Sequence, residues 1–122
     1  MVNMLATIQP QEVEVFYILP AIRRELSLAL KEQGKSQREI AKLLGVTEAA
    51  VSQYISKKRA ADVAFPAELA AEIRATAPRI TDRRSMMQET QRILAHAKDR
   101  KLTCRMHESV ADVPKGCDVC FR

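Results

Sequence analysis

The sequence predicts an all-α fold: a bundle of four to five helices, followed by an extra C-terminal helix and a small tail that contains cysteine and histidine. Apolar residues recur at the 3.6-residue spacing of helices along most of the 122-residue chain, and only three glycines interrupt it. Apolar residues make up 47% of the chain, which is enough for a core, and the 4% aromatic share makes that core mostly aliphatic. This length fits one domain with a modest extension.

The N-terminal segment has a mixed pattern. Glu12 to Val15 alternates like a strand, whereas the apolar residues from Val13 to Leu19 also fit a helix. We therefore expect residues 1–16 to form an arm or short helix that packs on the domain or on a second subunit.

The first clear helix is expected from Tyr17 or Leu19 to about Gln33. Pro20 suits its first turn, and Gly34 ends it. The apolar stripe that faces the core comprises Ile22, Leu26, Ala29 and Leu30.

The segment from Ser36 to Arg59 predicts two short helices joined by a tight turn. Ser36 and Glu39 have the spacing of a capping box, which satisfies two unpaired backbone donors at a helix start. Gly45 follows the first helix, at a position where a left-handed backbone is easiest for glycine. The apolar face of this helix comprises Ile40, Ala41, Leu43 and Leu44. The small Ala41 lets the two helices cross closely.

The second of these helices is predicted to have one buried and one polar face. Thr47 is its expected N-cap, and Val46 points into the core. Val51, Tyr54 and Ile55 are expected to be buried. The outward residues are Glu48, Ala49, Ser52, Gln53 and Ser56.

This outward face has the chemistry of base recognition. Gln53 can pair bidentately with adenine, Ser52 can donate or accept a hydrogen bond, and Ala49 can contact a thymine methyl group. Basic residues that follow suit phosphates, and the first helix offers free N–H groups at its N-terminus. The predicted DNA-contacting residues are Gln37, Arg38, Thr47, Glu48, Ala49, Ser52, Gln53, Ser56, Lys57, Lys58 and Arg59.

Charge supports the same interpretation. Residues 35–59 contain six basic and two acidic side chains, a local charge of +4 in a chain of net charge +5. Such a concentration favours a polyanionic partner. The alternative is an ordinary helical hairpin with a solvated basic face.

The segment resembles the Cro/repressor-like (XRE) helix-turn-helix family. The matching residues are Gln37, Ile40, Ala41, Leu44, Gly45, Val46, Thr47, Val51, Ser52 and Tyr54. The resemblance implies a helix-turn-helix bundle of four or five helices, a second helix inserted in the major groove of double-stranded DNA, and a homodimer on a two-fold operator. We assign residues 17–77 to this DNA-binding domain.

Two further helices are expected beyond the helix-turn-helix. Pro66 opens one from Ala67 to about Thr76, and Pro78 breaks it. Residues 78–102 are assigned to a C-terminal dimerisation helix, capped by Thr81 or Asp82. Its apolar positions are Met86, Met87, Thr90, Ile93, Leu94 and Ala97. This stripe fits core packing, a dimer seam or a ligand surface.

The tail, residues 103–122, has the pattern C-x2-H-x9-C-x2-C, formed by Cys104, His107, Cys117 and Cys120. Two closely spaced donor pairs, each in a tight turn, suit a tetrahedral ion, so zinc or an iron–sulfur cluster is the predicted cofactor. The alternatives are a metal-free redox pair of Cys117 with Cys120, or incidental cysteines. His96 is expected to be a surface or dimer residue.

The chain also resembles a group of helix-turn-helix regulators of archaea and some bacteria that carry a cysteine-rich tail. The shared features are the segment Tyr17 to Arg23 before the DNA-binding unit and the tail after it. This group often has a further C-x2-C pair on the preceding helix. Here Met86, Met87 and Thr90 occupy that neighbourhood, which argues against a cluster that needs the pair.

These observations predict a dimeric, sequence-specific transcriptional regulator whose tail is a structural clasp or a metal or redox sensor. The alternative is an antitoxin or phage-type accessory repressor that acts through a protein partner. No paired acid and base, activated nucleophile or phosphate loop indicates an enzyme or a small-molecule substrate. The chain has no run of 18 apolar residues and no signal-peptide pattern, so we expect no membrane association and a cytoplasmic location.

Overall fold

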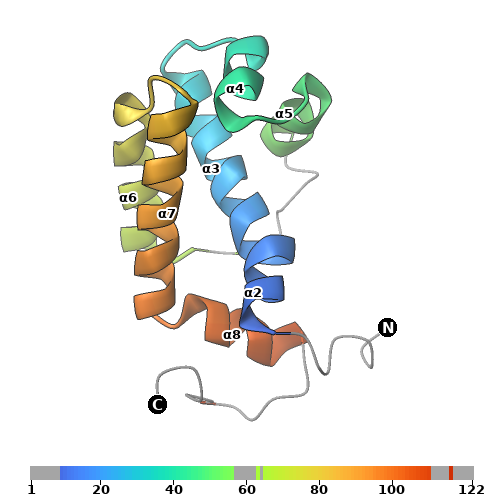
Figure 1. Cartoon of the computed structure of the whole chain (residues 1–122), viewed down its shortest axis with the longest axis vertical. Coiled ribbons are helices and arrows are strands. Elements are labelled where there is room, and N and C mark those ends of the chain that lie inside the picture. The colour runs from blue at the N-terminus through green and yellow to red at the C-terminus, as the bar shows by residue number, and fades with distance from the viewer. Residues whose placement is uncertain (1–8, 57–62, 64, 111–115, 117–122) are drawn as a thin grey trace.

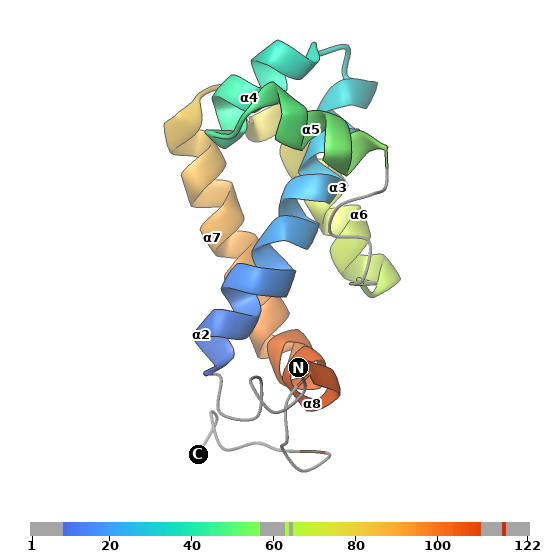
Figure 2. The same cartoon turned by 90° about the vertical axis from the view of Figure 1, so that its right-hand side faces the viewer.

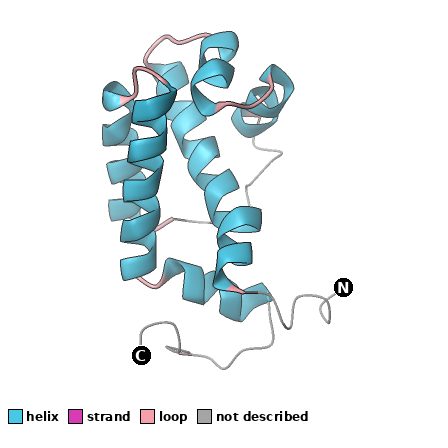
Figure 3. Cartoon of the chain, in the orientation of Figure 1, coloured by secondary structure: helices cyan, strands magenta, loops and turns pink. Residues whose placement is uncertain are grey.

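The computed structural model describes residues 9–56, 63, 65–110 and 116, and this part of the chain is built from helices joined by short turns, without a strand (Figure 3). The expected all-α fold is confirmed for these residues. The elements are α2 (Pro10–Val13), η1 (Glu14–Ile18), α3 (Leu19–Glu32), α4 (Gln37–Leu44), α5 (Glu48–Ile55), α6 (Ala67–Thr76), η2 (Ala77–Arg79), α7 (Arg83–Asp99) and α8 (Leu102–Val110).

The α3 helix begins at Leu19, as the sequence predicts, but it continues a helical segment that starts at Pro10. The two are joined by the π-helical turn η1, in which the Leu19 N–H donates to the Glu14 carbonyl five residues back. The cause is Pro20, which has no N–H and whose ring collides with the carbonyl four residues before it in a regular α-helix. A wider π turn relieves that conflict. The proline therefore marks a π turn inside a longer helix.

The bundle is organised around α3, which contacts α4, α5, α6 and α7. Figure 1 shows α4 and α5 at one end of the molecule, α6 and α7 alongside α3, and α8 across the opposite end. There α8 packs against α2 and α7. The predicted helix-turn-helix and the start of the predicted metal-binding tail thus lie at opposite ends.

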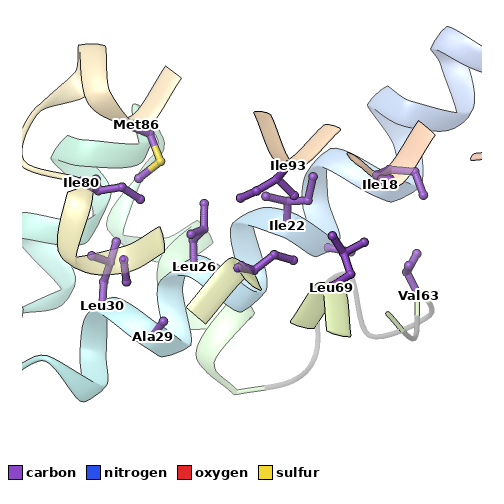
Figure 4. Close-up of a cluster of buried hydrophobic side chains, with 14 of the residues drawn as sticks. Ile18, Ile22, Leu26, Ala29, Leu30, Val63, Leu69, Ile80, Met86 and Ile93 are labelled. Atoms are coloured by element: carbon purple, nitrogen blue, oxygen red, sulfur yellow. The ribbon is translucent and has the colours of Figure 1, made fainter. Parts of the chain in front are cut away.

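The core follows the predicted apolar stripes. Ile22, Leu26 and Leu30 of α3 are fully buried, and they meet Leu69 of α6 and Ile93 of α7 (Figure 4). The expected α7 stripe is only partly internal, because Met87 is 67% exposed whereas its neighbour Met86 is buried. Met87 therefore belongs to the surface.

Ion pairs join the polar sides of α6 and α7. Glu72 of α6 forms ion pairs with Arg92 at 3.4 Å and with Arg100 at 3.5 Å, and it is hydrogen-bonded to His96. Arg92 also donates to the Glu89 carboxylate at 3.1 Å, and this hydrogen bond lowers the pKa of Glu89 below its ordinary value. His96, expected at the surface or at a dimer contact, is half-exposed and bound within the subunit.

A candidate nucleic-acid interface

The N-terminus of α4, the first helix of the predicted motif, is stabilised by two hydrogen bonds between neighbouring residues. The Glu39 N–H donates to the Ser36 hydroxyl oxygen at 3.1 Å, and the Ser36 N–H donates to the Glu39 carboxylate at 3.4 Å. Both bonds of the predicted capping box are therefore formed. They satisfy backbone donors that the helix itself leaves unpaired.

The turn between α4 and α5 depends on glycine for its backbone. Gly45 has φ = 70°, in the left-handed region, and its N–H donates to the Ala41 carbonyl at 2.9 Å. A Cβ atom at this position would meet nothing within 4 Å, so the backbone angle rather than lack of space requires glycine. Thr47 then caps α5, because its hydroxyl oxygen accepts the Ala50 N–H at 3.0 Å.

The α5 helix has one buried face and one exposed face, as the sequence predicts. Val51 is 0% and Tyr54 1% exposed, and both anchor the helix on the bundle. The residues on the opposite side are all exposed: Glu48, Ala49, Ser52, Gln53 and Ser56. Figure 2 shows α5 at the side of the molecule that faces the viewer, in front of α3. A rigid helix thus presents small and hydrogen-bonding side chains outward.

Two of the predicted contact residues use their hydroxyl groups within the subunit. The Thr47 hydroxyl accepts the cap bond just described, and the Ser56 hydroxyl donates to the Gln53 carbonyl at 3.2 Å. At the start of α4, Gln37 and Arg38 are exposed beside the helix N-terminus. Lys57, Lys58 and Arg59, predicted to bind phosphates, lie outside the described residues.

A long-range contact that the sequence did not indicate steadies α4. The Arg83 Nε–H of α7 donates to the Lys42 carbonyl at 2.9 Å, across 41 positions of sequence. This bond ties the C-terminal part of α4 to the start of α7. The sequence around Arg83 and Lys42 does not predict this contact, because it depends on how the helices pack.

Two of the four predicted metal ligands are described. Cys104 and His107 lie three positions apart on α8, where both are half-buried. The sequence suggested a tight turn here, and the structure has a helix. Cys117 and Cys120 lie outside the described residues, and within the described ones no three potential ligands gather in one place.

One contact brings the second part of the tail motif towards α8. The Gly116 N–H donates to the Glu108 carboxylate at 2.7 Å, and Gly116 has φ = 74°. Glu108 follows His107 directly, and Gly116 precedes Cys117. The chain therefore returns to the predicted ligand pair on α8 just before the second pair begins.

Comparison with known proteins identifies the central segment. Residues 26–73 match the model of a helix-turn-helix family, and this stretch runs from α3 through α4 and α5 into α6. No curated protein and no solved structure matches the chain. In the described part of the chain, no helix is long and apolar enough to span a membrane.

Proposed function

Because residues 26–73 form a helix-turn-helix domain of the Cro/repressor-like (XRE) family, which is a DNA-binding family, we propose that the protein is a transcriptional regulator that binds specific DNA sequences as a homodimer. The observation that carries this proposal is the exposed face of α5. Its residues are small or hydrogen-bonding, and the opposite face is locked into the core. A helix of this kind fits the major groove.

The roles of individual residues follow from their side-chain chemistry. Gln53 offers a donor and an acceptor to adenine, Ser52 hydrogen-bonds to either kind of edge group, and Ala49 leaves room for a thymine methyl group. The N-terminus of α4, where Gln37 is exposed, is suited to face a phosphate, because the first N–H groups of a helix have no carbonyl partner within it. Together these contacts specify the sequence and fix the helix in its register.

The basic residues after α5 supply affinity rather than specificity. Lys57, Lys58 and Arg59 follow the helix directly in sequence, and each phosphate they neutralise releases a counterion. Binding should therefore weaken steeply with salt.

A DNA titration with three variants tests this assignment. Gln53→Ala should lose about 1–3 kcal/mol on the preferred sequence and relax specificity, whereas Lys58→Ala should weaken all sequences similarly and lower the salt slope by about 1. Gln88→Ala on α7 is the matched control, because Gln88 is also an exposed helical glutamine but lies outside α5. If Gln53→Ala binds as the control does, the assigned face is wrong.

We further propose that Cys104, His107, Cys117 and Cys120 hold zinc or an iron–sulfur cluster, which clasps the tail or senses metal or redox state. The proximity of Cys104 and His107 on α8 and the Gly116–Glu108 bond support this set. Zinc would complete a closed structural site with three thiolates and one imidazole, whereas a cluster would add redox sensitivity.

Metal analysis of anaerobically purified protein tests the tail. Zinc without colour supports the clasp, and iron with absorption near 400 nm, roughly where thiolate-bound iron absorbs, supports the sensor. Cys104→Ser should lower the bound metal in either case, and Ser109→Ala, an exposed position on the same helix, is the control. Protein that contains neither metal contradicts the metal proposal and leaves the DNA-binding one intact.

A further inference from the structure

A groove runs along one face of the molecule between the long N-terminal helical segment and α7. It consists of two adjoining cavities of about 350 Å³ each, which share Leu19 and Gln91. One cavity reaches the Gly45 turn, and the other reaches Lys98 near the end of α7. From Arg83 to Lys98 the groove follows α7 for about 22 Å, at 1.5 Å per residue.

The groove contains exposed apolar side chains between polar ones. Among the described residues, the large apolar side chains left exposed are Val15, Phe16 and Met87, at 55%, 59% and 67%. Val15 and Met87 line the two cavities. Exposed apolar side chains rimmed by polar groups suit a contact with another protein surface.

Two of the four charged residues that line the groove, Arg23 and Glu14, are placed so that two copies of the chain can pair them. Arg23 lies four residues after Leu19, and Glu14 lies five residues before it. Both line the groove, and neither takes part in an ion pair or hydrogen bond of its side chain in the described part of the chain. If a second copy packs antiparallel about Leu19, Arg23 faces the partner subunit's Glu14, and two-fold symmetry repeats the pair.

We propose that this groove is the dimer interface, filled by a second copy of the chain that packs antiparallel with Leu19 on the two-fold axis. The orientation rests on the proposed function, because both α5 helices must face one DNA duplex. In Figure 2, α5 faces the viewer, and α7, which contributes residues to the groove, lies to the left. A two-fold axis directed towards the α5 side keeps both α5 helices on that side, whereas an axis along α3 would turn them to opposite sides.

The dimensions of such a dimer suit a two-fold operator. Leu19 and Glu32 are separated by about 20 Å of helix, so an antiparallel pair places the two α3 C-termini about 40 Å apart. The helix-turn-helix lies at this end of α3. The separation is close to the roughly 34–36 Å between half-sites one helical turn apart.

A charge-swap experiment tests the pairing. Arg23→Glu and Glu14→Arg should each weaken the dimer about tenfold, because each creates two like-charge contacts across the axis. An equal mixture of the two variants should recover dimerisation, since a heterodimer pairs opposite charges at both positions. Sedimentation equilibrium measures the dissociation constants. Arg74→Glu on α6, an exposed position outside the groove, should leave the dimer unchanged.

A second variant probes the apolar contact, and the outcomes separate this interface from DNA binding. Met87→Asp should also weaken the dimer at least tenfold while thermal melting shows a folded chain, because Met87 is exposed within the subunit. The proposed interface is overturned if the wild type is a dimer and all three variants dimerise as tightly as it does. It is also overturned if mixing the two charge variants does not restore dimerisation. A wild-type monomer that binds specific DNA overturns the interface and the homodimer but leaves sequence-specific DNA binding intact. A groove-dependent dimer without DNA affinity overturns only the DNA-binding function.

Discussion

Two pairs of helices at opposite ends of the molecule are joined by the same device. Gly45 between α4 and α5 has φ = 70°, and Lys101 between α7 and α8 has φ = 58°. Both angles are left-handed, a conformation that glycine adopts freely and that costs a residue with a side chain about 1–2 kcal/mol. The turn between α4 and α5 therefore has a glycine at its left-handed position, whereas the turn between α7 and α8 has a lysine there and is strained.

The difference teaches what holds each pair. At α4–α5, hydrogen-bonded caps at Ser36 and Thr47 define both helices locally. At α7–α8, burial of Leu102 and Thr103, at 7% and 4% exposed, accompanies the packing of α8 on α2 and α7. Local signals fix the helix assigned to DNA contact, whereas tertiary packing holds the helix that carries the first predicted metal ligands.

The largest expected effect comes from removing a buried side chain in each pair of helices, Ile40 in α4–α5 and Leu102 in α7–α8. Ile40→Ala should lower the free energy of unfolding by about 3–4 kcal/mol, because Ile40 is 0% exposed and its loss leaves a cavity in the core. Leu102→Ala should cost less, about 2 kcal/mol, since Leu102 lies at the edge of the core. Urea denaturation measures both values, and equal losses would contradict the difference in anchoring.

The second prediction concerns the glycine turn. Gly45→Ala should cost about 1–2 kcal/mol through backbone strain alone, since a Cβ atom has open space there. Gly45→Asn is the control, and it should cost less because asparagine tolerates the left-handed region better than alanine does. Thermal melting compares the variants. Full stability of Gly45→Ala would show that the turn does not depend on its backbone angle.

The third prediction adds a pH dependence at the start of α7. The Ser85 N–H donates to the Asp82 carboxylate at 2.8 Å, and this bond holds the pKa of Asp82 below its ordinary value. Because the folded pKa lies below the unfolded one, the stabilisation is present above about pH 4 and disappears as the pH falls through the folded pKa.

Asp82→Ala should therefore lower the melting temperature by a few degrees at neutral pH, and the deficit should shrink in acid. Asp82→Asn, which retains a capping oxygen without a titrating group, should keep most of the stability with no such pH dependence. Melting curves between about pH 2 and 7 test this range. A deficit that is constant with pH would exclude the charged cap.

The smallest expected effect is a gain at the other turn. Lys101→Gly should raise the free energy of unfolding by about 0.5–1 kcal/mol, because glycine relieves left-handed strain but loses more chain entropy on folding. Lys101→Asn also relieves the left-handed strain but avoids the extra loss of chain entropy that glycine brings. A loss of stability in both variants would mean that the lysine side chain outweighs the strain.

Much of the central fold could be predicted because its signals are short-range. The caps at Ser36, Thr47 and Asp82 lie three positions from their partners, and glycine at position 45 announces the turn. The buried and exposed sides of α5 follow from helical spacing, so its candidate contact face could be predicted before the fold was known.

Other features could not be predicted because they depend on packing. The lysine side chain at position 101 does not indicate a left-handed backbone, so the sequence does not predict the start of α8 at Leu102. The C-x2-H spacing predicts a tight turn, whereas Cys104 and His107 lie on a helix. Pro20 suggested a helix start, although the upstream residues continue the helix through a π turn. The exposure of Met87 likewise depends on how α7 rotates against α3.

The most direct test of DNA recognition by α5 is selection of binding sites from randomised duplex DNA. Wild-type protein should enrich a two-fold symmetric sequence with half-sites about 10–10.5 base pairs apart, and Gln53→Ala should relax the preference at one position in each half-site. Gln88→Ala should select the same sequence as the wild type. Enrichment of no sequence by the wild type, or identical preferences for Gln53→Ala, would contradict the account.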